Sequence, residues 1–168
     1  MARQEHPPPY RSPGEVLGAN VLAARLIRGW SQDHLAERMA VALGIEWVQS
    51  SVSQIEAARR RVSAEELLAL ALVLDQSVAE LVDPGGLDGR SGQGMVVGGV
   101  SLPSKTARAW LRGRLRLRAN EDGSLSAEPT EGNEGAIVGI VDELRELRKP
   151  RKTTTDKRRA TARQKGKS

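Results

Sequence analysis

Residues 49–58, QSSVSQIEAA, combine small polar side chains with two apolar ones in a pattern that suits recognition chemistry. At about 100° per residue, Val52 and Ile55 fall on one side of a helix. The opposite side is polar, short and nearly uncharged, and it carries Gln49, Ser50, Ser53, Gln54 and Ala57. Glutamine and serine reach base edges when a helix enters a DNA major groove, which is about 12 Å wide.

Three consecutive arginines follow this segment, in a part of the chain that is otherwise net acidic. They would lie where the end of the helix meets the sugar-phosphate backbone, and guanidinium groups commonly make such contacts. We therefore predict that Arg59, Arg60 and Arg61 bind phosphates beside the base-reading face.

The elements that must position these residues are helices. Apolar residues recur at helical spacing over residues 15–83, almost without internal proline. Stop and cap signals divide the stretch into five helices: Gly29 after the first, Ser31 before the second, and capping boxes at Ser63–Glu66 and Ser77–Glu80. The first of these helices is expected over residues 16–28.

Two stretches together, LGANVLAARLIRGWSQDHLAERM and SSVSQIEAARRRVSAEELLALALVLDQSVAELV, resemble one family closely. They are similar to the Cro and phage-repressor type of helix-turn-helix domain, also called the xenobiotic-response-element family. The resemblance covers about residues 17–82. It implies a mainly α fold, a five-helix DNA-binding domain whose third helix enters the major groove.

The resemblance also assigns roles to single residues. It implies that Gln32, at the start of the second helix, contacts phosphate, and that Gln49, Ser50 and Gln54 occupy base-reading positions. It further implies a buried ion pair between Arg25 and Glu56.

One departure from the family pattern lies between the second and third helices. About six residues more than the usual tight turn intervene within MAVALGIEWVQS. We expect the second helix to run on to Leu43 and to end at Gly44. Trp47 is then expected to pack into the enlarged turn as a core residue, because a single tryptophan is usually largely buried.

The rest of the chain is divided by composition. We expect a flexible leader at 1–13, the helix-turn-helix domain at 14–83, a glycine-rich linker at 84–104, a small α or α+β module at 105–148, and a disordered basic tail at 149–168. Within the module, the alternation of Arg114, Arg116 and Arg118 with leucines predicts a strand. NEDG at 120–123 is expected to turn it back through residues 124–128.

Residues 136–148 predict a short amphipathic helix with one apolar stripe. The stripe consists of Ile137, Ile140, Val141, Leu144 and Leu147. Because an isolated helix of this length is marginal in water, the stripe must cover the module or pair with a second copy of the chain. The module is therefore a candidate for dimerisation or for a second DNA contact.

Several classes of function are excluded by composition. No run of 18 apolar residues exists, so no membrane-spanning segment is predicted, and the first residues lack a secretory apolar region. The chain has no cysteine, and His6 and His34 stand alone, so we predict no metal site, no cofactor and no small-molecule ligand. No nucleophile–base pair or phosphate-cradling loop is visible, which indicates that the protein is not an enzyme.

The sequence thus favours a transcriptional regulator of double-stranded DNA, a phage immunity-type or bacterial repressor. Such a protein is expected in the cytoplasm, associated with the nucleoid, or in the host cytoplasm if phage-encoded. The alternative is an antitoxin whose residues 105–148 bind a partner toxin, which co-purification of a second small protein would reveal.

The positive charge of the chain is concentrated at its end. Residues 148–168 hold ten Lys or Arg and one acid, a net of +9, whereas the other 147 residues hold 16 bases and 20 acids, a net of −4. Such a segment cannot bury a core, and its charge suits a polyanion. The tail is therefore predicted to be an arm for DNA.

Deletion of residues 149–168 should weaken binding to every DNA sequence and leave the preferred site unchanged. The reason is that each lost phosphate contact removes a released counterion, whatever the base sequence. The measurement is the slope of log affinity against log salt, which should become shallower. An unchanged slope would show that the tail does not touch phosphate.

Overall fold

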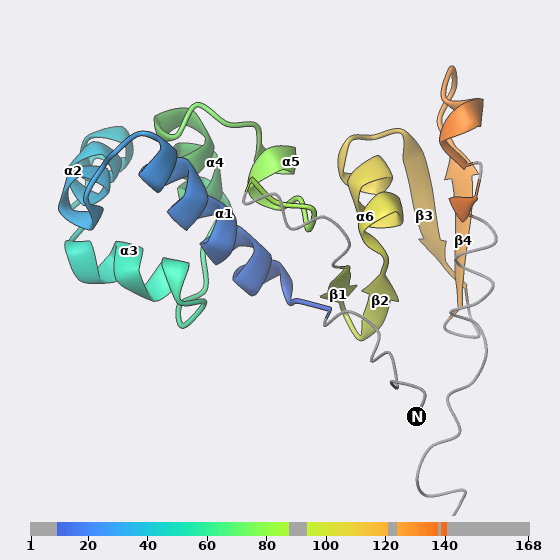
Figure 1. The fold of residues 1–168 in the computed structure, drawn as a ribbon, viewed down its shortest axis with the longest axis horizontal. Coiled ribbons are helices and arrows are strands. Elements are labelled where there is room, and N and C mark those ends of the chain that lie inside the picture. The colour runs from blue at the N-terminus through green and yellow to red at the C-terminus, as the bar shows by residue number, and fades with distance from the viewer. Residues whose placement is uncertain (1–9, 88–93, 121–123, 138, 141–168) are drawn as a thin grey trace, which may run out of the picture.

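The computed structural model describes residues 10–87, 94–120, 124–137 and 139–140 (Figure 1). Five helices come first: α1 (Pro13–Ile27), α2 (Gln32–Leu43), α3 (Gln49–Glu56), α4 (Ala64–Val73) and α5 (Val78–Leu81). They are followed by β1 (Met95–Val97), β2 (Val100–Leu102), α6 (Ser104–Leu111), β3 (Leu115–Ala119), β4 (Leu125–Pro129) and a 3₁₀ helix, η1 (Glu134–Ile137).

The five predicted helices are confirmed, and most of their ends follow the cap signals. α2 ends at Leu43 with Gly44 in the left-handed region, at φ 67°. The capping boxes at Ser63 and Ser77 are both formed. α1 begins at Pro13 rather than at residue 16, because Ser12 and Glu15 form a third capping box that the sequence analysis missed.

The apolar faces of the first four helices and of α5 meet in one core. Its fully buried side chains include Leu35, Met39, Ile55, Leu70 and Leu74. Trp47 belongs to this core with 7% of its surface exposed, which confirms the prediction made from the enlarged turn.

Helices α1 and α3 approach each other unusually closely at Gly18. A Cβ atom at this position would lie 2.4 Å from the carbonyl oxygen of Ile55 and 2.9 Å from that of Glu56. Only glycine therefore allows the backbone of α1 to pass over the last turn of α3.

An ion pair holds the same two helices together farther along. Arg25 Nε lies 2.6 Å from Glu56 Oε1, and its Nη2 lies 3.0 Å from Oε2, so the contact is bidentate. The side chains are only 9% and 6% exposed. This is the pair that the resemblance implied, and its hydrogen bond raises the pKa of Arg25 above the ordinary value.

The part of the chain expected as a linker contains regular structure. Residues 95–102 form the antiparallel hairpin β1–β2, in which Met95 pairs with Leu102 and Val97 with Val100. The two turn residues, Gly98 and Gly99, have φ of 57° and 83°, as a two-residue hairpin turn requires. The linker prediction was wrong here because a Gly-Gly turn between short apolar runs was interpreted as flexibility.

The leader prediction also needs correction where the structure describes it. Arg11 donates its backbone N–H to Gly94 and accepts one from Val96, so it pairs with Met95 of the hairpin. The ring of Tyr10 lies directly over Gly94. Residues 10–12 therefore tie the start of α1 to β1, and only residues 1–9 of the expected leader lie outside the described residues.

The predicted strand and its return are confirmed in β3 and β4. Arg116 pairs with Glu128, and Leu117 with Ala127, in an antiparallel register. Leu115 is buried, and Leu117 and Leu125 pack against a second small core of Met95, Leu102 and Ala107. The helix α6 in front of β3, with Ala107 on its buried side, was not predicted.

Two buried polar side chains organise the end of the helical domain, and one of them joins it to the second part. Asn20 donates its amide to the carbonyls of Glu80, Leu81 and Asp83 and accepts the N–H of Leu87. Asp83 accepts from Arg108 of α6 at 2.9 Å and from Arg112, the residue that follows α6, at 3.4 Å. α6 is thereby anchored to the end of the helical domain.

The helix predicted over residues 136–148 does not begin as expected. Residues 134–137 form the 3₁₀ helix η1. Gly139 then adopts a left-handed conformation, at φ 79°, before Ile140, which is fully buried. The remaining stripe residues Val141, Leu144 and Leu147 and the basic tail lie outside the described residues. Among the helices that are described, none is long and apolar enough to cross a membrane.

Substitution Gly18→Ala should destabilise the fold by about 1–3 kcal/mol, because the added methyl group must push α1 away from α3. Gly14→Ala is the matched control, since nothing lies within 4 Å of a Cβ there and the residue is also in α1. A chemical denaturation curve for each variant checks this. Equal midpoints for the two variants would contradict the close approach.

Substitution Glu56→Gln should lower the free energy of unfolding by about 3–5 kcal/mol, because it leaves the Arg25 guanidinium buried without its counter-charge. Glu37→Gln makes the same chemical change on an exposed side chain of α2 and should leave the melting temperature unchanged. A Glu56→Gln melt within a degree of wild type would count against the role of the pair.

Candidate nucleic-acid interface

Helix α3 presents its small polar side chains outward, because its apolar side is fixed in the core. Val52 and Ile55 are 1% and 2% exposed. On the other side Gln49, Ser50 and Gln54 are exposed, and Ser53 is half-buried. The predicted reading face is therefore accessible, with Ser53 the least available of its members.

The start of this face is organised by a chain of hydrogen bonds from the buried ion pair. Gln32 Nε2 donates to Glu56 Oε2 at 2.7 Å, and Gln32 Oε1 accepts from Gln49 Nε2. The structure thus joins Gln32 and Gln49, which the sequence placed in separate phosphate and base roles, to one buried carboxylate.

This chain fixes which way the Gln49 amide points. A carboxylate can only accept, so Gln32 turns its NH₂ group to Glu56 and its oxygen to Gln49. Gln49 then has one N–H in use and keeps its oxygen and its second N–H. Those two groups are what a glutamine needs to pair with N6 and N7 of adenine.

The C-terminal end of α3 leads directly into the three arginines that are expected to contact phosphate. Ala58 adopts the left-handed conformation at φ 54°, Ala58 N–H bonds to the Ile55 carbonyl, and Arg59 N–H bonds to the Gln54 carbonyl. This Schellman arrangement ends the helix sharply. Arg59 and Arg61 follow it as exposed side chains.

Arg60 differs from its two neighbours, because its guanidinium is already engaged within the protein. It forms an ion pair with Glu66 of α4 and lies over the ring of Trp47, 5.5 Å from the centroid. Burial by itself would raise the pKa of Glu66, but hydrogen bonds from Ser63 and Arg60 hold it below the ordinary value. Arg60 thus connects the enlarged turn to α4, a role that a count of basic residues could not reveal.

The enlarged turn opens a hollow beside the start of α3. The hollow measures about 460 Å³ and is lined by Asp33, Ala36, Glu37, Trp47, Val48, Gln49 and Ser50. Its two carboxylates disfavour a phosphate at this edge. The exposed guanidinium groups of Arg59 and Arg61 are better suited to a phosphate than this edge.

The part of the chain that the structure describes contains no cluster of three or more His, Asp or Glu side chains suited to a metal ion. The accessible groups of the interface are amides, hydroxyls and guanidiniums. These groups bind by hydrogen bonds and charge, as contacts to base edges and phosphates do.

Comparisons with known proteins agree with this geometry. A family model described as "Helix-turn-helix" matches residues 21–81. No curated protein sequence matches the chain.

Two solved structures are similar to it. The restriction-modification controller protein C.AhdI from Aeromonas hydrophila shares 31% identity, with 40% of this chain and 94% of that chain covered and a TM-score of 0.33. The hypothetical transcription factor NHTF from Neisseria shares 22% identity, with 49% and 87% covered and a TM-score of 0.36.

Because both TM-scores are low, the assignment rests on the family match over residues 21–81. Through residues 21–81 the chain belongs to the Cro and phage-repressor type of helix-turn-helix family, whose members are DNA-binding transcriptional regulators and not enzymes.

Proposed function

We propose that the protein is a sequence-specific repressor that reads the major groove of double-stranded DNA with α3. In this proposal Gln49, Ser50, Ser53 and Gln54 face base edges. Gln32, Arg59 and Arg61 contact phosphates on either side, and Arg60 supports them from within the fold.

The observation that carries the proposal is the pairing of an exposed, uncharged face on α3 with a buried network behind it. Gln49 is held through Gln32 to Glu56, and its remaining amide groups are free to meet a base. Gln54 is exposed, and within the described residues its side chain makes no hydrogen bond. A reading helix needs this combination of fixed position and unused polar groups, because specificity depends on donor and acceptor placement.

We infer repression because a protein bound in the major groove at a promoter blocks access to that DNA. A protein seated in the major groove at an operator that overlaps a promoter excludes RNA polymerase by occupying the same DNA. No further contact surface is needed for this effect, whereas activation requires one that binds the polymerase.

Substitution Gln54→Ala should cost about 1–3 kcal/mol on a selected binding site and relax the preference at one A·T pair, because a bidentate contact to adenine is lost. The measurement is competition between the selected site and its single-base variants, after a site has been selected from random duplexes. Gln49→Ala should relax a different base position.

Gln76→Ala is the matched control, since the Gln76 side chain, in the loop after α4, bonds within the described residues only to the backbone of Asp75. Arg61→Ala should weaken all sequences about equally, because a phosphate contact carries no base information. If Gln54→Ala and Gln49→Ala both lost affinity uniformly across every variant, α3 would not be reading bases through these residues.

Whether the protein represses or activates transcription is tested separately, with a reporter gene whose promoter contains the selected site. Wild-type protein should lower transcription, and Gln54→Ala should restore it. An increase of transcription by the wild-type protein would overturn repression and leave base reading intact.

A further inference from the structure

The outer face of the β3–β4 hairpin is a second basic surface, separate from α3. Alternation along β3 places Arg116 and Arg118 on one side, opposite Glu128 and Ser126 of β4 in the register. The bond from Thr130 N–H to the Arg114 carbonyl extends the ladder by one residue, so Arg114 shares this side. All three arginines are exposed.

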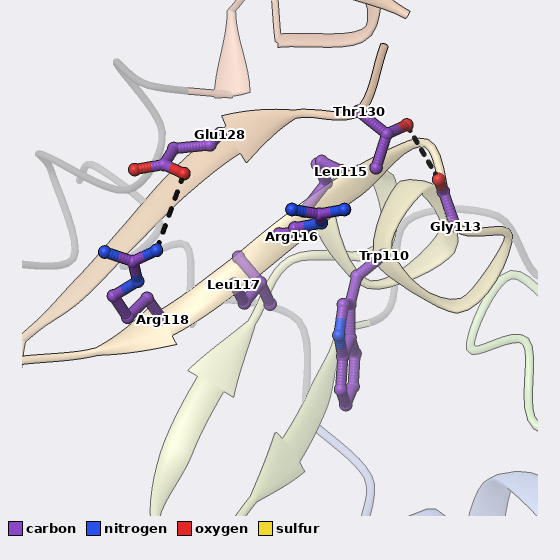
Figure 2. A pocket seen from close by; sticks show the side chains of 8 residues that line it. All are labelled: Trp110, Gly113, Leu115, Arg116, Leu117, Arg118, Glu128 and Thr130. Carbon is purple, nitrogen blue, oxygen red and sulfur yellow. Dashed lines mark hydrogen bonds and ion pairs between the residues drawn. The ribbon is translucent and has the colours of Figure 1, made fainter.

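The arginines of β3 point outward because the leucines that alternate with them pack inward. Leu115 is 2% exposed, and Leu117 packs against the second core. Figure 2 shows Arg116 and Arg118 on β3 and Glu128 on β4, around an open hollow of about 430 Å³ that is also lined by Trp110. The face therefore consists of guanidinium groups on a rigid two-stranded support.

Among the described residues, most of the positive charge on this face is not neutralised by a carboxylate. Glu128 lies 3.9 Å from Arg118, a loose contact between exposed groups. Within the described ranges no carboxylate pairs with Arg114 or Arg116, whereas Arg108 of α6 and Arg112 just after it are paired with Asp83. Counted over the residues that the structure describes, the hairpin face carries three positive charges and one negative charge, and so it suits a polyanion.

We propose that this face binds the phosphate backbone of DNA that flanks the site read by α3. Double-stranded DNA matches it because phosphates recur regularly along a groove edge, and arginines on a strand recur about every 6.7 Å. The proposal extends the proposed function and does not require that α3 read bases. The contact adds affinity without sequence preference.

The position of the hairpin explains why flanking DNA is the partner. α2 and α3 lie at one end of the long axis of the molecule, and β3 and β4 lie at the other (Figure 1). Asp83 holds α6, and through it β3, to the helical domain. A contact from this face therefore falls beyond the base pairs that α3 covers.

The test compares the full chain with the triple variant Arg114→Gln, Arg116→Gln, Arg118→Gln on two duplexes. One duplex ends at the selected site, and the other extends it by about one helical turn of 10 base pairs on each side. The variant should lose the affinity gained from the flanks, and its log–log salt slope on the long duplex should be shallower by about 2–3. On the short duplex the two proteins should bind alike.

Two further variants separate the effect of charge from an effect on folding. Replacement of the same three residues by lysine retains the charge and should retain the slope. Glu128→Gln removes the one carboxylate of the face and should steepen the slope, so the proposal can be tested even if the triple variant is poorly folded.

An equal salt slope for the wild-type protein, the triple glutamine variant and Glu128→Gln on the long duplex would overturn the proposal, as expected if this face met an acidic protein instead. If α3 read no bases, a random duplex of the longer length would replace both probes. The salt slopes of the wild-type protein and the variants on that duplex would still test whether the hairpin face binds DNA. The two proposals therefore fail on different measurements.

Discussion

The carboxylate of Glu56 is the point on which the arrangement of the helical domain depends. It lies almost wholly buried at the end of α3 and accepts hydrogen bonds from Arg25 of α1 and Gln32 of α2. A buried charge is costly unless it is paired and fully hydrogen-bonded, so the three helices must keep their places around it. Gln49 is oriented through Gln32 by the same group, so the residue proposed to read a base belongs to the network that stabilises the domain.

The enlarged turn before α3 is stabilised by a different device. Trp47 fills the space that the extra residues create, and Arg60 covers its ring while pairing with Glu66 at the start of α4. The turn is therefore packed rather than loose, although Ile45 and Val48 within it remain exposed. The first residue of α3, Gln49, follows this turn and is bonded to Gln32 of α2.

Much of the fold could be predicted because its signals are local. Serine caps at residues 31, 63 and 77, the left-handed glycine at 44 and the alternating arginines of β3 each act within a few residues. The predictions that were wrong also concern local signals. Gly98–Gly99 forms a hairpin turn although its composition is typical of a linker, and the Ser12–Glu15 box starts α1 within a proline-rich segment.

The sequence by itself determined the five helices of the first domain and the polar face of α3, because side-chain type and helical period are properties of short segments. Tertiary structure alone decided how those residues are used. Arg59, Arg60 and Arg61 are identical in type, yet only Arg60 meets Trp47 and Glu66, since the fold brings distant segments against the middle one. Likewise the anchoring of Gln49 depends on Glu56 and Gln32, which become neighbours only when three helices pack together.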